Sequence, residues 1–120
     1  MKPYQDARVE GEKLAKQYAE LEQADQVDFY NGLEGYYSVL GHNKKQEAIA
    51  VLIEKNDHKI YVYQLDKGIS QDKAATISRE KGASDIDKVT FGRYQDKPIW
   101  EVKSGNHYYL VDFETGALFQ

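Results

Sequence analysis

Small and apolar residues near the start of the chain recur at steps of three and four. Gly11, Leu14, Tyr18 and Leu21 form one narrow stripe, and charged residues fill the positions between them. This spacing is typical of a helix that packs one side against a core. The pattern predicts a helix over residues 5–24.

β-Branched and aromatic residues then replace the helical period. They occur in short runs bounded by Gly, Asn and Asp, which is the pattern of strands joined by hairpins. The expected strands are residues 36–40, 47–55 and 59–65, with a short segment around 27–30, a polar loop over 41–46 and a turn at Asn56-Asp57.

A second helical segment follows Gly68. Ser70 is the expected N-cap, because its hydroxyl can accept a free backbone N–H. Ala74 and Ile77 follow at helical spacing, and Gly82 can supply the left-handed residue that ends a helix. Further strands are expected over residues 88–94, 98–103, 106–113 and 117–120.

The order of helix, strands, helix and strands raises the question of an internal repeat. Sliding the chain by 58 positions places residues 51–61 on residues 109–119 without a gap. With a loop difference of five residues, Tyr37-Ser38-Val39 falls on Trp100-Glu101-Val102. We therefore expect an α+β fold of two tandem small units, each with one helix packed on an antiparallel sheet. The two units are residues 1–65 and 66–120.

Composition is that of an ordinary folded domain, with 41% hydrophobic and 30% charged residues. The longest apolar run, Ala48–Ile53, is far shorter than the roughly 20 residues that span a bilayer. The net charge of −4 falls in the first 66 residues, with 8 basic and 12 acidic groups; the rest has 8 of each. Nucleic-acid binding needs a concentrated basic face, so we exclude that class.

Residues for catalysis are sparse. The absence of cysteine excludes disulfides, thiolate metal sites and cysteine nucleophiles. His42, His58 and His107 fall in or beside predicted turns, without the spacing that brings two imidazoles to one metal. The glycines are dispersed, and no Gly-x-Ser-x-Gly segment is present. We expect no catalytic site, no metal and no cofactor.

The segment "DFETG" near the end of the chain allows two interpretations. Asp112 and Glu114 share a face by strand alternation, so a small hydrolase or glycan-binding enzyme using this pair is one hypothesis. In the other, Asp112 bonds backbone amides of the turn and Gly116 takes a positive φ. The turn "EKNDHK", 58 positions earlier, has the same polarity. We favour the structural interpretation.

The second unit resembles the PepSY family. The segments that carry the resemblance are "ISQDKAATISREKG", "PIWEV" and "VDFETGAL". The first unit, through "YYSVLGHNKKQEAIAVLIEKND", is similar to the domain that precedes PepSY in the TseB-like cell-wall elongation regulators. Together the two resemblances cover nearly the whole chain and imply a PepSY- or cystatin-like fold.

The resemblance also implies a function. Such proteins are held in the cytoplasmic membrane by one N-terminal helix, which we expect upstream of this polar start, and the folded part lies outside the cell. We expect a non-catalytic, extracytoplasmic, membrane-tethered interaction module that regulates cell-wall elongation by binding a penicillin-binding protein. The alternative is a PepSY-type modulator or inhibitor of a secreted peptidase. The oligomeric state is left open.

Aromatic residues are the candidates for partner contact. A helix on one side of a sheet leaves the other face partly open, and tyrosines with polar tips suit protein contacts or stacking on sugar rings. An equal alternative is that these residues fill the interface between the units. The candidates are Tyr61, Tyr63, Tyr94, Trp100 and Tyr108.

Overall fold

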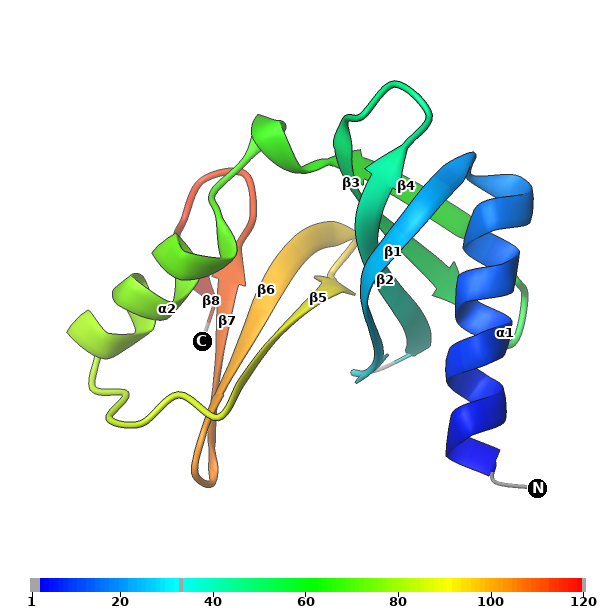
Figure 1. Cartoon of the computed structure of the whole chain (residues 1–120). Helices are drawn as coiled ribbons and strands as arrows, with labels where there is room; N and C mark the ends of the chain where they lie inside the picture. The colour runs from blue at the N-terminus through cyan, green and yellow to red at the C-terminus, as the bar shows by residue number, and fades with distance from the viewer. Residues whose placement is uncertain (1–2, 33, 120) are drawn as a thin grey trace. The chain divides into compact units, whose positions relative to one another are not determined.

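The computed structural model describes residues 3–32 and 34–119, with side chains from residue 9 onward. The chain divides into two compact units, residues 1–64 and 65–120. In the described residues, each unit is one α-helix with a four-stranded antiparallel sheet, which confirms the α+β fold (Figure 1). No helix in these ranges has the length and apolar content needed to cross a membrane.

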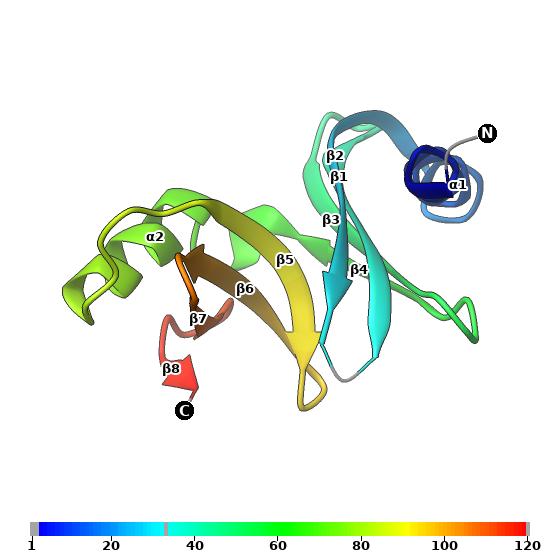
Figure 2. The ribbon, with the colours of Figure 1, turned by 90° about the horizontal axis from the view of Figure 1, so that it is seen from below.

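The first unit contains helix α1 and strands β1 to β4, which pair in chain order. The bounds are α1 Pro3–Tyr18, β1 Leu21–Asn31, β2 Gly35–Asn43, β3 Ala48–Glu54 and β4 Ile60–Gln64. Helix α1 lies on one face of this sheet, and its packing decreases from β1 to β3 (Figure 2). Gly11 permits this contact, because a Cβ there would lie 3.1 Å from Cβ of Tyr37. The core beneath the helix contains Ala15, Leu21, Tyr37, Val39, Ile49, Val51 and Ile53.

The predicted first helix was too long. Helix α1 ends at Tyr18, Glu20 takes a φ of 57°, and β1 begins at Leu21. Strand β1 pairs with β2 through register shifts at Leu21/Gln23 and Ala24/Gln26. Such irregularities break the period of two that marks a strand in sequence. The short segment expected around 27–30 is therefore part of an eleven-residue strand.

The predicted polar loop over residues 41–46 was also wrong in its first half. Gly41 to Asn43 continue β2, and the loop begins after them. A Cβ on Gly41 would overlap the carbonyl oxygen of Gln23, so the close pairing with β1 requires glycine. Asn43 then holds the loop, since its Oδ1 accepts the backbone N–H groups of Lys45 and Glu47, each at 2.9 Å.

The second unit begins with a short 3₁₀ turn, η1, and continues with helix α2 and strands β5 to β8 in chain order. The bounds are η1 Leu65–Lys67, α2 Gln71–Glu80, β5 Lys88–Tyr94, β6 Lys97–Ser104, β7 His107–Asp112 and β8 Leu118–Phe119. Ser70 caps α2 by accepting the backbone N–H of Lys73 at 3.0 Å. Gly82 takes a φ of 118° after the helix. Both features confirm the sequence prediction for this helix.

The strand registers of the two units correspond. Tyr37 lies opposite Ile53 in the first sheet, and Trp100 lies opposite Val111 in the second. These are the positions that the internal alignment placed on one another. In the second unit the core is aromatic: the ring centroid of Phe91 lies 4.9 Å from that of Trp100 and 5.2 Å from that of Phe113.

Candidate interaction surfaces

The acidic turn after β7 is built around one carboxylate. Asp112 is buried, and its Oδ1 accepts the backbone N–H groups of Glu114 at 2.7 Å and Thr115 at 3.2 Å. Gly116 takes a φ of 83°, and its N–H donates to the Asp112 carbonyl at 2.8 Å. Glu114 is exposed. The Asp112 carboxylate therefore holds the turn, and Glu114 does not share its environment.

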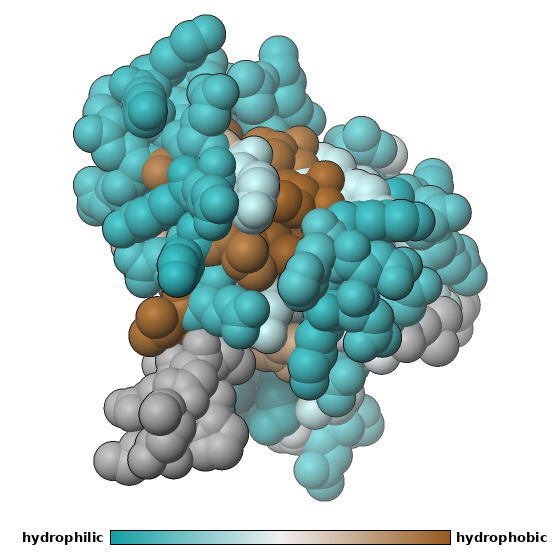
Figure 3. All heavy atoms as spheres, turned by 90° about the vertical axis from the view of Figure 1, so that its right-hand side faces the viewer, coloured by the Kyte–Doolittle hydropathy of each residue, from teal (hydrophilic) through white to brown (hydrophobic). Residues whose placement is uncertain are grey.

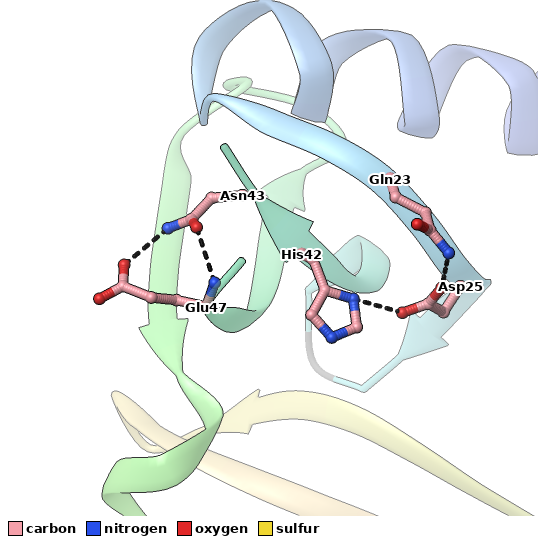
Figure 4. Close-up of polar contacts among 5 residues, drawn as sticks. All are labelled: Gln23, Asp25, His42, Asn43 and Glu47. Carbon is pink, nitrogen blue, oxygen red and sulfur yellow. Dashed lines mark hydrogen bonds and ion pairs between the residues drawn. The ribbon is translucent and has the colours of Figure 1, made fainter. Parts of the chain in front are cut away.

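The histidines lie in separate places. His42 projects from β2 toward Asp25 on β1, with 2.9 Å between Nδ1 and Oδ2, and both side chains are 40% exposed (Figure 4). Gln23 donates to the other oxygen of Asp25 at 2.8 Å. His58 lies in the turn before β4, and His107 begins β7. No group of three or more His, Asp or Glu side chains in the described part of the chain could hold a metal ion.

The polar contacts in Figure 4 belong to the end of the first sheet. Asn43 donates from Nδ2 to Oε1 of Glu47 at 2.8 Å, which adds a third bond to the two that already hold this loop. The His42–Asp25 pair crosses from β2 to β1 beside the register shifts of β1. The cluster therefore holds an irregular strand end together, and half-exposed pairs of this kind contribute little stability.

Two of the predicted contact residues lie on β4. Tyr61 pairs with Leu52 and Tyr63 with Ala50, so both side chains point to the face opposite α1. Both are half-buried, and the Tyr61 ring lies 6.3 Å from that of Tyr36 in an edge-on contact. The alternation of these tyrosines with Ile60 and Val62 is as the sequence predicted.

Trp100 lies in the core of the second unit. Its side chain is 2% exposed, and its indole N–H donates to the carbonyl of Ile69 at 3.0 Å. The ring also contacts Phe91 and Phe113 edge-on. In this structure Trp100 is a packing residue that joins the sheet to the segment before α2. A sequence signal for this was present, because Trp100 is in phase with the buried Val102 along β6.

The remaining two candidates share the other face of the second sheet. Tyr94 pairs with Lys97 and Tyr108 with Lys103, so both side chains lie on the face opposite Trp100. Tyr108 is 58% exposed, while Tyr94 is half-buried against Phe119, with 5.4 Å between ring centroids. Six residues along β6 separate their partners, which corresponds to about 20 Å. They therefore lie at opposite ends of one face.

Three residues that were not among the predicted contact residues accompany these tyrosines. Glu101 lies opposite Leu110, and Leu110 lies opposite Phe119, so all three share the face of Tyr94 and Tyr108. All three are half-buried. Strand alternation alone would have found them. We call Tyr94, Glu101, Tyr108, Leu110 and Phe119 the outer face of the second sheet.

Glu101 is the perturbed acid of this outer face. Its burial among neighbouring side chains raises the pKa of the carboxyl above the ordinary value, while the Lys88 ammonium acts in the opposite direction. By register Glu101 lies between Thr90 and Leu110. This half-buried acid gives the face an acceptor that an approaching hydrogen-bond donor could use.

The fold and these surfaces define a small two-unit α+β module with an exposed tyrosine, Tyr108, on a sheet face. The model of the family described as "Cell wall elongation regulator TseB-like domain" matches residues 10–54. Over 113 residues the chain is 35% identical to the Bacillus subtilis (strain 168) protein named "Probable cell wall elongation regulator TseB", covering 88% of this chain and 70% of that protein.

A solved structure supports the same relationship. The YpmB protein from Bacillus subtilis matches with a TM-score of 0.79 and 33% identity, and 93% of each chain is covered. The chain belongs to the family of TseB-like cell wall elongation regulators.

Proposed function

We propose that this protein regulates cell-wall elongation without catalysing a reaction, by binding a protein partner outside the cytoplasmic membrane. The observation that carries the proposal is the 35% identity to a protein named as a regulator of this process, over 88% of the chain. The site geometry agrees with it, because the buried Asp112 carboxylate is used by its own turn.

The partner in this proposal is a penicillin-binding protein, since enzymes of that class polymerise and crosslink the wall. The contact surface is the outer face of the second sheet. Tyr108 is its most exposed ring, and exposed tyrosines combine an apolar body with a polar tip that suits protein interfaces. Glu101 supplies an acceptor near the centre of the face.

Membrane tethering is a further part of the proposal. In this proposal a helix upstream of these residues anchors the two units in the membrane, so that they lie outside the cell. A run of about 20 apolar residues in the upstream reading frame would form this helix. We also propose that the second unit is a PepSY domain and that the two units are repeats. Their corresponding strand registers support a common origin.

A crosslinking experiment tests the partner. A photoreactive amino acid replaces Tyr108 in the full reading frame, and a matched variant carries it at Val9, which is 65% exposed on α1. After irradiation of living cells, a fluorescent penicillin labels every penicillin-binding protein. We expect a fluorescent crosslinked band from position 108 and none from position 9.

Two results would contradict the proposal. If position 108 crosslinks no penicillin-labelled protein, or if both positions crosslink it equally, the outer face does not bind such an enzyme. If position 108 captures a secreted peptidase instead, and the purified chain slows that peptidase, the PepSY-type modulator replaces the wall regulator.

A further inference from the structure

Strand β4 forms an open edge of the first sheet. The Glu54 N–H donates to the Lys59 carbonyl at 2.8 Å, and this bond fixes which β4 residues face β3. In an antiparallel pair the inward and outward residues alternate. The backbone groups of Tyr61 and Tyr63 therefore point to β3, and those of Ile60, Val62 and Gln64 point away. In the described part of the chain, nothing bonds the outward groups.

The side chains beside this edge are apolar and open. Val62 lies opposite the buried Val51 on the face that carries α1, yet it is 48% exposed. Ile60 and Leu14 are half-buried against the same core. This follows from the packing of α1, which decreases from β1 to β3 and leaves β4 beyond it. On the side that carries α1, Figure 3 shows an apolar area bordered by hydrophilic residues.

Strand β4 is a short edge strand of five residues, but it lacks three other protections that edge strands usually have. Its sequence, IYVYQ, has no charged residue and no proline, and it pairs with β3 without a register shift. Proteins normally guard an exposed edge with a charge, a proline or a bulge, because unpaired backbone groups invite another strand. Strand β1, at the opposite edge of the same sheet, has two such irregularities.

We propose that a second copy of this chain pairs antiparallel with β4 about a twofold axis at Val62. This register places Val62 opposite Val62 of the second copy and Ile60 opposite Gln64. Residues whose backbone groups point away from β3 then lie opposite one another in the two copies. Their N–H and C=O groups can therefore form hydrogen bonds across the two edges. The uncharged sequence brings no like charges together, and the Val62 side chains join two apolar surfaces. This inference does not depend on the proposed function.

The oligomeric state of the full chain tests the pairing. Sedimentation velocity is run at concentrations up to about 1 mM, so that a dimer with a dissociation constant as weak as this is still detected. We expect the wild-type chain to reach twice the monomer mass. Val62→Lys puts two ammonium groups face to face and should abolish the dimer, while Val62→Thr should keep it. Val9→Lys, at an exposed valine elsewhere, should leave the dimer unchanged. Far-UV circular dichroism confirms that each variant is folded.

A symmetric crosslink tests the register. The chain has no cysteine, so Val62→Cys introduces a single thiol. Hydrogen-bonded antiparallel pairs have Cα atoms about 5.5 Å apart, which lies within the range of a disulfide. Mild oxidation should convert Val62→Cys to a covalent dimer and leave Val9→Cys mostly monomeric. A monomeric wild-type chain, a dimeric Val62→Lys variant, or equal crosslinking at both positions overturns the proposal.

Discussion

Asp112 and Glu114 are two residues apart, yet their carboxylates lie in different environments. Asp112 is 5% exposed and accepts two backbone N–H groups of its own turn, whereas Glu114 is exposed. An acid–base pair needs two groups that reach the same substrate atoms from environments that separate their pKa values. At the scale of single residues, the turn therefore has a structural role.

Removing the Asp112 carboxylate should destabilise the second unit. Asp112→Ala leaves two backbone donors without their acceptor, and we expect a loss of about 1–3 kcal/mol in the free energy of unfolding. Asp112→Asn keeps one acceptor oxygen and should lose less, and Glu114→Gln should change nothing. Urea unfolding followed by fluorescence of Trp100, the one tryptophan, measures this unit. An unchanged midpoint in Asp112→Ala would contradict the role.

Glu101 should make the stability of the second unit depend on pH. Burial raises the pKa of this carboxyl in the folded state, so the folded protein binds its proton more tightly than the unfolded chain. The contribution of Glu101 to the free energy of unfolding is fully present below the pKa that its carboxyl has in the unfolded chain. It is lost as the pH rises through the pKa of the folded state. Glu101→Gln cannot ionise and should be more stable than wild type at pH 7, with the advantage vanishing in acid.

The same unfolding measurement, repeated across pH, checks this prediction. Glu114→Gln is the matched control, because it removes an exposed carboxyl from the same unit. The difference between Glu101→Gln and wild type should grow from acid to neutral pH, while the control shows no such trend. A difference independent of pH, or one that grows in acid, would contradict the assignment.

At the scale of elements, the close pairing of β1 with β2 limits which substitutions the first unit tolerates. Gly41 lies where β1 crosses β2 between its irregular registers, and a Cβ there would overlap a backbone oxygen of Gln23. A backbone atom cannot move aside as the end of a side chain can. Gly11, on α1, faces the Tyr37 side chain at 3.1 Å, which is a milder contact.

Gly41→Ala should therefore destabilise the first unit far more than Gly11→Ala. We expect a loss of about 1–3 kcal/mol or more for Gly41→Ala from overpacking. In Gly11→Ala the tight contact opposes a gain of about 1 kcal/mol in helix propensity, so the net change should be small. Amide hydrogen exchange of β2 and β3 measures both. Equal protection in Gly41→Ala and wild type would show that the strands do not need this approach.

Elements with local signals could be predicted from the sequence, and elements set by pairing could not. Helix α2 has its cap at Ser70 and its terminator at Gly82, both readable in the chain. The apolar residues of strand β1 do not alternate with a period of two, because its pairing with β2 shifts register twice. Leu21, where β1 begins, also lies at helical spacing from the residues of α1, so the start of the strand was not visible in the sequence. Trp100 is one of the predicted contact residues, although its phase along β6, which it shares with Val102, places it on the packed face. The outer face could have been found from alternation alone.

At the scale of the whole molecule, the functional question is which surface carries regulation. Each unit is a helix on a four-stranded sheet, and each has a different exposed feature. The first has the unguarded edge of β4, and the second has the outer face with Tyr108. The two proposed contacts, association with a second copy and binding of a penicillin-binding protein, should therefore be separable by mutation.

The rate of lateral wall elongation tests the central claim most directly. Cells that lack the natural gene receive the full reading frame with Tyr94→Ala and Tyr108→Ala on the outer face, or with Asp112→Asn and Glu114→Gln in the turn. Immunoblotting ensures equal amounts of each folded protein. Cell elongation, measured by time-lapse microscopy, should fail with the outer-face variant and be restored by the turn variant. Restoration by the outer-face variant and failure of a stable turn variant would contradict an interaction module and favour catalysis.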